Sequence, residues 1–464
     1  MVEVKFDCKT TFPEKVAVIG AAKSGIAAAR FFREHNVSIL ISDLSCDDAI
    51  ARLLELNNLS ECAYESGGHT KRILDADLIV ISPGVPSDIP IVQQANELNI
   101  PVWSEMELGF RASRAPFLAV TGSSGKSTTV SLTGAALNAA GIEHVVAGNI
   151  GIPVIDAVPV LSEKGFAVVE VSSFQLETID RFRPYAAVIL NFMKNHLDRY
   201  STVEAYYTAK KEIARNMNRE NYLILNANDP QLRSWGKEMA LHTTVVYFGD
   251  DIAAGDAFWY DGTRLRYRFN GNEGIFGECG MMRLKGRHNF DNASVAAALA
   301  MIAGAESDTA FRGMCTFGGL PHRLEFVKEI DGVAWFNDSK STTAESIDCA
   351  VNAFQSSVHL IAGGKDKGCD FSLVREAIRN KVKDIVLIGE AAGRMRDQWS
   401  DLVPVSVAST LEEAVAIAGS QATAGDSVVF SPGCSSFDMF KNFEDRGDRF
   451  RVIVNTMATK GCRL

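Results

Sequence analysis

Short apolar runs alternate with helix-like stretches along the first hundred residues of the chain. Apolar strands are predicted at 16–19, 37–41 and 78–81, and a helix is predicted at 26–34. Strands and helices in this order form a parallel sheet with crossover helices. The first segment is therefore predicted to be α/β.

The alternation continues in a middle segment, where strand-like runs lie at 117–120, 167–171 and 187–190. A helix is predicted to begin near Thr128, and an alanine-rich helix near Phe290. From about 243 to 284 apolar and polar residues alternate, and Asp261-Gly262 separates two such runs, which is typical of a β-hairpin. The pattern predicts an α/β segment with an added antiparallel piece.

A third segment again has the pattern of a parallel sheet, with strands predicted at 333–336, 358–362, 385–388 and 428–430. Polar loops follow three of these strands, with the sequences NDSKSTT, GGKDKGCDF and SPGCSSFDMF. Ligands of such sheets bind just beyond the carboxyl ends of the strands. The three loops therefore predict one shared site.

Length and composition limit the class of protein. The chain has 464 residues, more than one ordinary core holds, so about three domains are expected. Its net charge of -10 argues against a general nucleic-acid or membrane-surface role. Nine cysteines without a C-x-x-C pair indicate free thiols. Since the chain shows no signal-peptide pattern and no run of about 18 apolar residues, we expect a cytoplasmic protein.

The stretch VTGSSGKST at 120–128 lies between a predicted strand and a predicted helix. Its G-x-x-G-K-S pattern runs from Gly122 to Ser127, and such a turn before a helix attracts phosphate oxygens. Lys126 would reach the outer phosphates, and the Ser127 hydroxyl would hold a divalent cation. The strict pattern G-x-x-x-x-G-K-[ST] fails because Val120 replaces its first Gly. The alternative is an ordinary Gly/Ser turn, but strand, turn, lysine and helix together favour a nucleotide.

Three further residues of the middle segment have two interpretations each. Glu170 lies in the apolar run VVEVSSFQ, so it is either a magnesium ligand beside the phosphate loop or a solvent-facing residue of an edge strand. A lone histidine such as His196 is more often structural than a ligand. Two adjacent lysines, Lys210 and Lys211, ordinarily belong to a solvated helix face.

A second glycine-containing loop, Gly20 to Gly25, follows the first predicted strand. It is similar to G-x-G-x-x-G but has Ala22 at the middle glycine. Asp43 lies 18 residues after Gly25, where a ribose-binding acid lies in dinucleotide folds. The loop predicts a nucleotide or diphosphate ligand, and NAD is as good a candidate as any other.

A series of motifs along the chain resembles the Mur ligase family. In order they are TGSSGKST, GNIG, VVEVSSFQLE, NHLDRY followed by AYYTAKK, GRHNFDN, GLPHRLE, NDSKST and SPGCSSFDMFKNFEDRG. The resemblance covers essentially the whole chain, and the last two motifs resemble the family member that adds D-glutamate. The family's phosphate loop is the shorter G-x-x-G-K-[ST] form, which accounts for Val120.

The resemblance implies three α/β domains that bind a UDP-linked substrate, ATP and the incoming amino acid in turn. We predict a Rossmann-like N-terminal domain at 1–112, a central P-loop ATPase-type domain with an antiparallel β piece at 113–318, and a Rossmann-like C-terminal domain at 319–464. The implied activity is ATP-dependent ligation of D-glutamate to UDP-N-acetylmuramoyl-L-alanine through an acyl phosphate, in peptidoglycan synthesis. We expect a cytoplasmic monomer with small-molecule partners only.

The resemblance assigns the phosphate loop and Glu170 to ATP and one magnesium ion. His196 and Lys210 would serve a second magnesium ion, with Lys210 carbamylated, because an ammonium group cannot coordinate a cation. Lys210 is preferred to Lys211 for its place in the family's A-x-A-A-K pattern. The implied catalytic residues are Lys126, Glu170, His196 and Lys210, and the implied metal ligands are Ser127, Glu170, His196 and Lys210.

The resemblance also implies three groups of binding residues. Those for ATP are Gly122, Ser123, Ser124, Gly125, Lys126, Ser127, Thr128, Asn289, Asn292, Arg323 and Asp338. Those for the UDP-linked substrate are Ala21, Lys23, Ser24, Asp43, Gly84, Asn149 and His196. Those for the amino acid are Thr342, Lys367, Ser436, Phe437 and Phe443.

Several of these residues have an ordinary structural interpretation as well. Asn289 and Asn292 would be helix N-terminal caps. Arg323 would be a surface residue in a proline-containing turn, and Lys367 a charge in a flexible loop. The chain also departs from the family pattern: Ser124 replaces Asn, Ala22 replaces Gly, and Thr343 stands where Asn is usual.

Three other functions remain open at this point. The nearest is another amino-acid-adding ligase of the family, or a folylpolyglutamate-type enzyme, with a different third-domain pocket. An NAD-linked oxidoreductase would rest on residues 20–43, but Ala22 and the second nucleotide loop argue against NAD. A non-catalytic nucleotide-binding regulator is disfavoured by the joint presence of Lys126, Glu170, His196 and Lys210.

Overall fold

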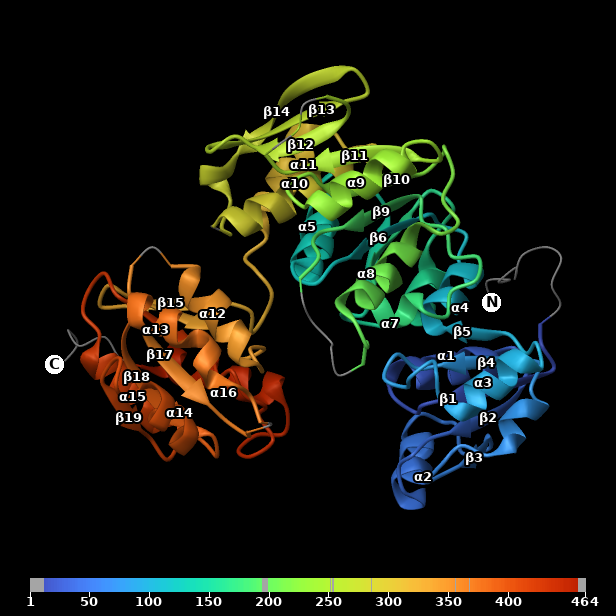
Figure 1. Cartoon of the computed structure of the whole chain (residues 1–464), viewed down its shortest axis with the longest axis horizontal. Coiled ribbons are helices and arrows are strands. Elements are labelled where there is room, and N and C mark those ends of the chain that lie inside the picture. Colours follow the sequence, from blue (N-terminus) through green and yellow to red (C-terminus); the bar gives the residue numbers. More distant parts are fainter. Residues whose placement is uncertain are drawn as a thin grey trace. The chain divides into compact units, whose positions relative to one another are not determined.

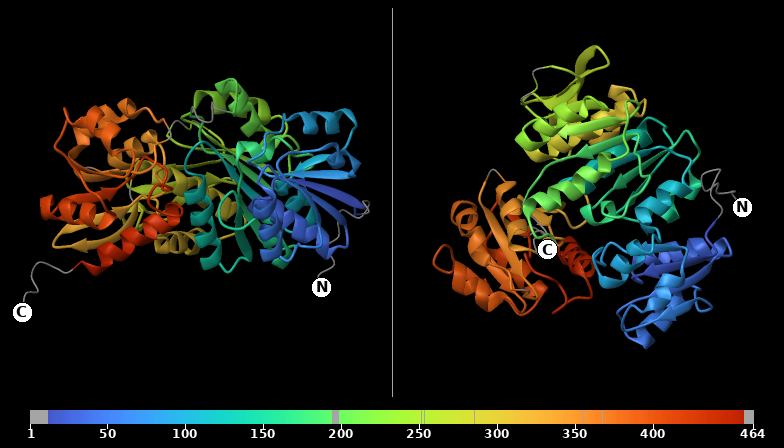
Figure 2. Two further views of the ribbon diagram at one scale, coloured as in Figure 1. Left: turned by 90° about the horizontal axis from the view of Figure 1, so that it is seen from below. Right: turned by 45° about the vertical axis from the view of Figure 1, so that its right-hand side comes forward.

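The structure is a computed structural model that describes residues 12–193, 199–250, 252, 254–284, 286–354, 356–366 and 368–457. Its contacts divide the chain into two compact units, Met1–Phe317 and Gly318–Leu464. Three sheets with helices on both faces make up these units (Figures 1 and 2). This confirms the α/β class. The predicted boundary at 112/113 falls between the first two sheets and stays a prediction.

The first sheet is parallel throughout, with the strand order β3-β2-β1-β4-β5. Its strands are β1 (Lys15–Ile19), β2 (Ser38–Ser42), β3 (Ala63–Glu65), β4 (Leu78–Ile81) and β5 (Val102–Ser104). Its helices are α1 (Lys23–Glu34), α2 (Asp47–Leu56), the 3-10 helix η1 (Lys71–Asp75), α3 (Pro90–Glu97) and α4 (Glu105–Ala112). The inner strand β4 is buried on both faces, which is why its sequence LIVI is continuously apolar. The parallel order is the predicted one, but α1 begins three residues before the predicted start at Ile26.

The second sheet has nine strands in the order β14-β13-β12-β11-β10-β9-β6-β8-β7. They are β6 (Phe117–Thr121), β7 (His144–Gly148), β8 (Phe166–Glu170), β9 (Ala186–Ile189), β10 (Tyr222–Asn226), β11 (Thr244–Phe248), β12 (Ala257–Tyr260), β13 (Arg264–Phe269) and β14 (Asn272–Glu278). Pairing is parallel from β7 to β12 and antiparallel from β12 to β14. The predicted hairpin is confirmed, but β11 still belongs to the parallel part, so the antiparallel piece is smaller than predicted.

Helices cover both faces of this second sheet. They are α5 (Lys126–Ala139), α6 (Val154–Ala157), η2 (Val158–Val160), α7 (Ser173–Leu176), α8 (Val203–Lys211), η3 (Glu212–Ala214), α9 (Pro230–Met239), η4 (Cys279–Met281), α10 (Arg287–Ile302) and α11 (Ser307–Thr316). One apolar core lies between the sheet and α5, α10 and α11, and the other lies on the opposite face. Helix α5 begins at Lys126 rather than Thr128, so the phosphate-loop lysine is the first residue of the helix.

The second unit contains a six-stranded sheet in the order β15-β16-β20-β17-β18-β19. Its elements are β15 (Glu325–Ile330), β16 (Val333–Asn337), α12 (Ala344–Asn352), β17 (Val358–Gly363), η5 (Phe371–Val374), α13 (Arg375–Lys381), β18 (Val382–Ile388), α14 (Ala392–Trp399), β19 (Val405–Val407), α15 (Leu411–Gln421), β20 (Ser427–Phe430) and α16 (Phe443–Thr456). All pairs are parallel except β15 with β16. The four predicted strands are confirmed, and β15 and β19 were not predicted.

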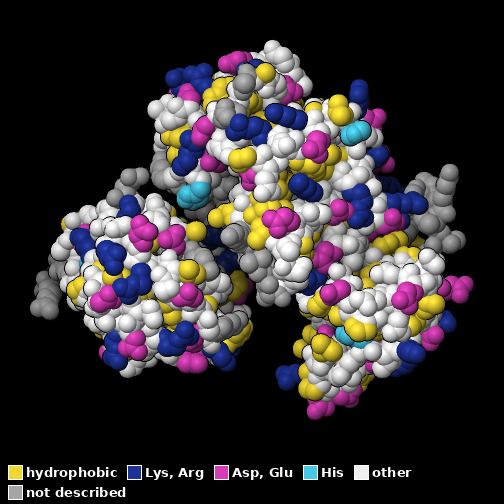
Figure 3. All heavy atoms as spheres, viewed as in Figure 1, with side chains coloured by type: hydrophobic (Ala, Val, Ile, Leu, Met, Phe, Trp, Pro, Cys, Tyr) yellow, Lys and Arg dark blue, Asp and Glu magenta, His cyan; other side chains and the backbone are white. Residues whose placement is uncertain are grey.

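Charged side chains of both signs are interspersed on the one face of each unit that Figure 3 shows. On the face shown in Figure 3, Lys and Arg side chains alternate with Asp and Glu side chains over the atoms that are coloured. This visible face therefore carries no continuous patch of one sign among the described residues. Within those residues, too, no helix is long and apolar enough to cross a bilayer.

The second unit holds a buried histidine between two carboxylates, at the amino-terminal edge of its sheet. His359, on β17, is 2% exposed, and its Nδ1 lies 2.8 Å from Asp384 Oδ2 while its Nε2 lies 3.2 Å from Asp426 Oδ2. Asp426 also forms an ion pair with Lys383. The hydrogen bond with Asp384, aided by Asp426, raises the pKa of His359 above its ordinary value of 6.5 despite burial.

This histidine predicts a pH dependence of stability. Because the folded pKa lies above the unfolded one, the protonated His359 stabilises the fold fully below about pH 6.5, and this contribution is lost as the pH rises through the folded pKa. We therefore expect the free energy of unfolding to fall as the pH rises above about 6.5, and to fall less in His359→Gln. Urea unfolding at several pH values measures both slopes. The control is His242→Gln at an exposed histidine, and equal slopes in wild type and His359→Gln would contradict the prediction.

Candidate functional site

The phosphate-type loop between β6 and α5 needs glycine at two positions. Gly122 has φ +146° and Gly125 has φ +85°, both in the region that favours glycine. A Cβ atom at Gly122 would lie 2.9 Å from the Leu190 Cβ, and one at Gly125 would lie 2.5 Å from Asn292 Oδ1. The loop is therefore packed closely against both β9 and α10.

The side chain of Asn191, which follows β9, holds the backbone of this loop through hydrogen bonds. Its Oδ1 accepts hydrogen bonds from the N–H groups of Ser123 (3.1 Å) and Ser124 (2.9 Å), and its Nδ2 donates to the Ser124 carbonyl (3.2 Å). The Ser124 residue is itself exposed. The departure from Asn at this position therefore leaves the loop backbone supported. Sequence reasoning missed Asn191, although its place directly after a strand was a usable signal.

Glu170 lies at the carboxyl end of β8 and receives hydrogen bonds from two sides. Its Oε2 accepts from Ser127 Oγ at 2.6 Å, and its Oε1 accepts from Asn149 Nδ2 at 2.8 Å. The residue is 3% exposed, and β8 lies between β6 and β7. The alternative of a solvent-facing glutamate on an edge strand is therefore wrong. A buried carboxylate and a hydroxyl are hard oxygen donors of the kind that Mg²⁺ prefers.

Lys210 is buried, and the solvated-face interpretation is wrong for it. The residue is 1% exposed, its Nζ donates to the Gly122 carbonyl at 3.0 Å, and Nζ lies 4.5 Å from the centre of the Tyr206 ring. Burial, aided by the nearby charge of Lys126 and opposed by that of Glu170, lowers the pKa of Lys210 to about 6. Its neighbour Lys211 is only half-buried, with Nζ 5.3 Å from the Trp235 ring centre.

Lys126 shares an acceptor with Lys210. Its Nζ donates to the same Gly122 carbonyl at 3.0 Å and to the Ser123 carbonyl at 3.4 Å. The Nζ atoms of both lysines therefore lie 3.0 Å from the same oxygen, the Gly122 carbonyl. Such an arrangement is unfavourable when both amines carry a charge, and it is relieved when one of them is neutral or becomes an anion.

Helix α10 approaches the phosphate loop through Asn292. The helix begins at Arg287 with Gly286 as its N-cap, so the interpretation of Asn289 and Asn292 as N-terminal caps is wrong. Asn292 lies in the second turn, is 7% exposed and has its Oδ1 against Gly125. Asn289 is half-buried one turn earlier.

The residues predicted for the UDP-linked substrate lie mostly at the carboxyl edge of the first sheet. Ala21 and Ser24 follow β1, Asp43 follows β2, and Gly84 follows β4. Asp43 accepts from the N–H groups of Ala21 (2.6 Å) and Ser45 (2.8 Å). Burial raises the pKa of Asp43, but hydrogen bonds from Ser45 and Ala21 bring it below its ordinary value.

Of the three remaining residues of this group, Lys23 and Asn149 belong to the contact with the second sheet, and His196 lies outside the described residues. The Lys23 Nζ donates to the Gly151 carbonyl, next to the loop that carries Asn149. Asn149 is the residue that binds Glu170. A Cβ atom at Gly84 would meet no atom within 4 Å, so the space above this turn is open.

In the second unit, three polar loops meet at the carboxyl ends of β16, β17 and β20. Asp338, after β16, accepts from Ser431 Oγ at 2.8 Å, and the Lys365 N–H, after β17, donates to the Ser435 carbonyl at 2.8 Å. The sequence pattern predicted that these loops lie together, and they do. Asp338 is 7% exposed, and burial raises its pKa to about 7.

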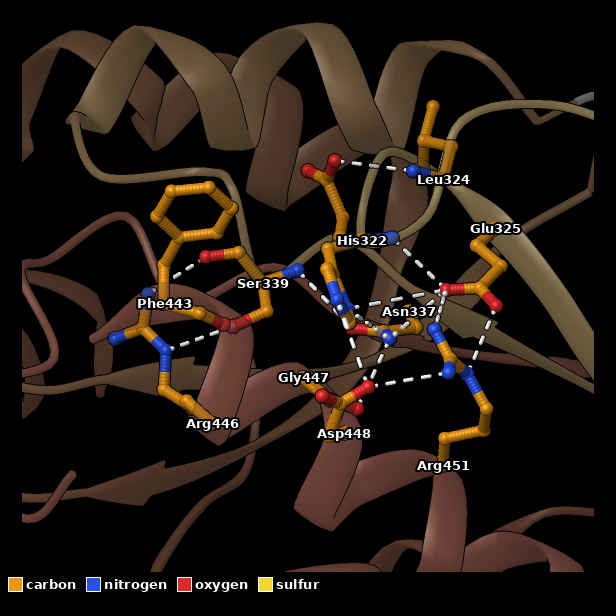
Figure 4. A network of polar contacts seen from close by, with 11 residues as sticks. His322, Leu324, Glu325, Asn337, Ser339, Phe443, Arg446, Gly447, Asp448 and Arg451 are labelled. Carbon is orange, nitrogen blue, oxygen red and sulfur yellow. Dashed lines mark hydrogen bonds and ion pairs between the residues drawn. The ribbon is translucent and has the colours of Figure 1, made fainter. Parts of the chain in front are cut away.

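Arg323 lies in a turn whose backbone donates hydrogen bonds to the carboxylates of Asp338 and Glu325. Figure 4 labels its neighbours His322 and Leu324. It is flanked by His322 (φ +61°) and Leu324 (φ +41°), two non-glycine residues in the left-handed region. The Leu324 N–H donates to Asp338 Oδ1 at 3.1 Å and the His322 N–H to Glu325 Oε2 at 2.8 Å. Arg323 itself is half-buried rather than a plain surface residue.

Arg446, on α16, connects two of the loops. It is 1% exposed and donates to Ser339 Oγ (2.9 Å), the Ser339 carbonyl (2.7 Å) and the Cys434 carbonyl (3.0 Å). Burial lowers the pKa of Arg446 to about 10. Ser339 Oγ in turn donates to the Phe443 carbonyl at 2.9 Å (Figure 4). Sequence reasoning missed Arg446, since nothing in its helix pattern separates a buried arginine from an exposed one.

The residues predicted for the amino acid are distributed over the same loops. Ser436 is buried, Thr342 and Phe443 are half-buried, and Phe437 is 62% exposed. Lys367 and His196 lie outside the described residues. Among the residues that the structure does describe, no three His, Cys, Asp or Glu side chains form a group that could hold a metal ion.

Three family models match consecutive parts of the chain. They are the Mur ligase MurD-like N-terminal domain at 14–104, the Mur ligase middle domain at 120–300 and the Mur ligase glutamate ligase domain at 322–434. Two curated relatives are named UDP-N-acetylmuramoylalanine--D-glutamate ligase. The one from Geotalea uraniireducens is 40% identical over 96% of this chain and 98% of its own length. The one from Acidobacterium capsulatum is 39% identical over 95% and 96%.

Solved structures with the same fold come from the same group of enzymes. MurF from Acinetobacter baumannii matches with a TM-score of 0.61 at 16% identity, covering 94% of this chain and 93% of that one. UDP-N-acetylmuramate-alanine ligase MurC from Thermotoga maritima matches with a TM-score of 0.58 at 17% identity, covering 95% and 99%. At these identities the likeness concerns the fold alone.

The packing of Gly125 predicts a specific cost of substitution. We expect Gly125→Ala to lower the free energy of unfolding by about 2 kcal/mol or more, because strain at positive φ adds to a clash with Asn292. Gly141→Ala is the matched control, with φ +69° but no atom within 4 Å of the added Cβ, and should cost about 1 kcal/mol. Chemical denaturation measures both. Equal costs at the two positions would show that the contact with α10 is not tight.

Proposed function

The chain belongs to the Mur ligase family, and on this premise we propose that it joins D-glutamate to UDP-N-acetylmuramoyl-L-alanine in peptidoglycan synthesis. Enzymes of this family use ATP and Mg²⁺. The observation that carries the proposal is the group formed by Lys126, Ser127, Glu170 and Lys210 around the loop at Gly122. Relatives that match this chain over nearly their whole length bear the name of this activity.

The proposed reaction has two steps. The terminal carboxylate of the UDP-linked substrate attacks the γ-phosphate of ATP in line, which forms an acyl phosphate and releases ADP. The neutral amine of D-glutamate then attacks the acyl carbonyl. Inorganic phosphate leaves with the electron pair of the broken C–O bond, and the nitrogen loses one proton as the amide forms. Lys126, whose Nζ lies at the loop beside the Gly122 carbonyl, would neutralise charge on the transferred phosphoryl group.

Ser127 and Glu170 are the residues that would hold a magnesium ion beside this loop. Their hydroxyl and carboxylate oxygens lie 2.6 Å apart, and both donors suit a hard divalent cation. A magnesium ion bound there would supply charge neutralisation at the phosphate oxygens. Asn149, through its bond to Glu170 Oε1, would hold the carboxylate in the orientation that this requires.

We further propose that Lys210 is carbamylated and, with His196, serves a second magnesium ion. The neutral amine attacks CO₂, an N–C bond forms, a proton leaves, and the product is a carbamate anion. Burial of Lys210 and the nearby charge of Lys126 favour the neutral amine. The modification would replace repulsion between two amines at Gly122 by attraction between an anion and Lys126.

For the second unit we propose that Arg323 binds phosphate and Asp338 the ribose of ATP. The amino-acid pocket would be formed by Thr342, Lys367, Ser436, Phe437 and Phe443. A dicarboxylate needs cations and hydroxyl or N–H donors, and these loops supply both kinds of group. For the first unit, Ala21, Lys23, Ser24, Asp43, Gly84, Asn149 and His196 would bind the UDP-linked substrate. That the enzyme acts as a cytoplasmic monomer stays a prediction.

The reaction is tested by phosphate release from ATP. We expect release that requires Mg²⁺, UDP-N-acetylmuramoyl-L-alanine and D-glutamate together, with formation of the amide product detected by mass spectrometry. L-Glutamate, meso-diaminopimelate and L-alanine are the control amino acids. Turnover with one of these and not with D-glutamate would overturn the substrate assignment. Hydride transfer with NAD, without ATP hydrolysis, would overturn the assignment to ATP-dependent ligases.

Adjacent lysines offer a matched test of the carbamate. We expect Lys210→Ala to lower kcat by about a hundredfold or more, since a buried ligand group is lost. Lys211→Ala should keep wild-type turnover within about twofold, because this side chain is half-buried against Trp235. With ¹³C-labelled bicarbonate, the wild type should show a carbamate carbon signal in NMR that Lys210→Ala lacks. Unchanged turnover of Lys210→Ala, with or without bicarbonate, would contradict the proposal.

A further inference from the structure

Arg199 connects the two sheets of the first unit at a point that the proposed mechanism does not use. It belongs to the second-sheet part of the chain, before α8, and its guanidinium group reaches the turn that follows β4. Nη1 donates to the Pro83 carbonyl at 3.2 Å, and Nη2 donates to the Val85 carbonyl at 3.3 Å. The two acceptors stand on either side of Gly84, so one planar group holds both ends of that short segment.

The guanidinium group is itself held in place by its surroundings. Its Nη2 also donates to Glu177 Oε2 at 3.0 Å, and its central carbon lies 4.3 Å from the centre of the Phe174 ring. The side chains of Arg199 and Glu177 are 16% and 14% exposed. A partly buried pair of this kind is stronger than a surface ion pair, and the stacked ring restricts the orientation of the guanidinium plane.

Glu177 is the centre of this contact. Besides Arg199, it accepts hydrogen bonds from Ser87 Oγ at 2.7 Å and from Tyr200 Oη at 2.5 Å. Ser87 comes from the first sheet's connection after β4, and Tyr200 lies next to Arg199. The Glu177 carboxylate and the Arg199 guanidinium group therefore connect the two sheets. Glu177 does so through the Ser87 side chain, and Arg199 through backbone carbonyls after β4.

The turn held by Arg199 also supports the glycine loop after β1. The Val85 N–H donates to the Ser82 carbonyl at 3.0 Å, and Ser82 Oγ donates to the Gly20 carbonyl at 2.7 Å. A Cβ atom at Gly20 would lie 2.8 Å from the Ser82 Cβ and 2.9 Å from Val85 Cγ2, so the two loops are in close contact. A displacement of Val85 is therefore transmitted to Gly20 and to its neighbour Ala21.

From this chain of contacts we infer that Arg199 is a positioning residue for the UDP-linked substrate. It acts through the backbone around Gly84 and through the loop at Gly20, and it does not itself touch the reacting atoms. The inference rests on the proposed function for the identity of the substrate. A lysine could reach only one of the two carbonyls with a point charge, whereas the planar arginine group reaches both at once.

The chain offers a matched control for the contact between the sheets. Arg30, on α1, forms an ion pair of 2.7 Å with Asp156 on α6, which also joins the first sheet to the second. This pair is about one-third exposed on both sides and is not bonded to the turn at Gly84. Removing it tests the general effect of weakening the contact between the sheets.

The experiment compares Arg199→Ala, Arg199→Lys and Arg30→Ala in steady-state kinetics with each substrate varied in turn. For Arg199→Ala we expect the KM for UDP-N-acetylmuramoyl-L-alanine to rise about tenfold or more, since a charged group loses three hydrogen bonds. The KM values for ATP and D-glutamate should stay within about twofold. Arg199→Lys should restore part of the lost affinity, and Arg30→Ala should leave all three KM values within about twofold.

Direct titration calorimetry of UDP-N-acetylmuramoyl-L-alanine, without ATP, gives a second readout that does not depend on turnover. A loss of affinity in Arg199→Ala that matches the KM change supports the inference. The inference is overturned if this affinity is unchanged, if the KM for ATP rises equally, or if Arg30→Ala has the same effect. If Arg199→Ala does not fold, the same comparison is made with Arg199→Lys and with Ser87→Ala. A wild-type protein that neither binds nor turns over the UDP-linked substrate overturns the proposed function instead.

Discussion

The burial of one carboxylate determines how the candidate site is built. Glu170 ends β8, which lies between β6 and β7, and is 3% exposed, so its charge requires partners that the surrounding elements must supply. Ser127 comes from the first turn of α5, and Asn149 comes from the loop after β7. Each partner fixes the position of a different loop. The strand order β6-β8-β7 is what places both loops within reach of one side chain.

The second constraint is the shared carbonyl of Gly122. Lys126 and Lys210 both donate to it at 3.0 Å, one from the start of α5 and one from the end of α8. Burial and the neighbouring charge of Lys126 both disfavour the protonated form of Lys210, so both lower its pKa. The packing of α8 against the loop and the position of Lys126 therefore favour a neutral amine at Lys210.

Much of the fold could be predicted from the sequence because the signals are local. The apolar runs of parallel strands and the Asp261-Gly262 hairpin depend on neighbouring residues only. Helix starts were less accurate, since α1 and α10 begin without a side-chain cap and so lack the usual polar signal. Within the site, the apolar neighbours of Glu170 in the sequence indicated that it is buried, as it is. The burial of Lys210 next to a half-buried lysine is decided by tertiary packing, which sequence spacing does not contain.

The second unit shows how packing can also hold a strained loop. His322 and Leu324 adopt positive φ on both sides of Arg323, a conformation that costs free energy in non-glycine residues. Asn337, fully buried on β16, donates to His322 Nδ1, Glu325 Oε2 and the Gly447 carbonyl (Figure 4). Gly447 allows this approach, because a Cβ there would lie 2.1 Å from the histidine ring. Strand β16 thus supports the strained turn through Asn337, and the turn fixes the backbone of the half-buried Arg323.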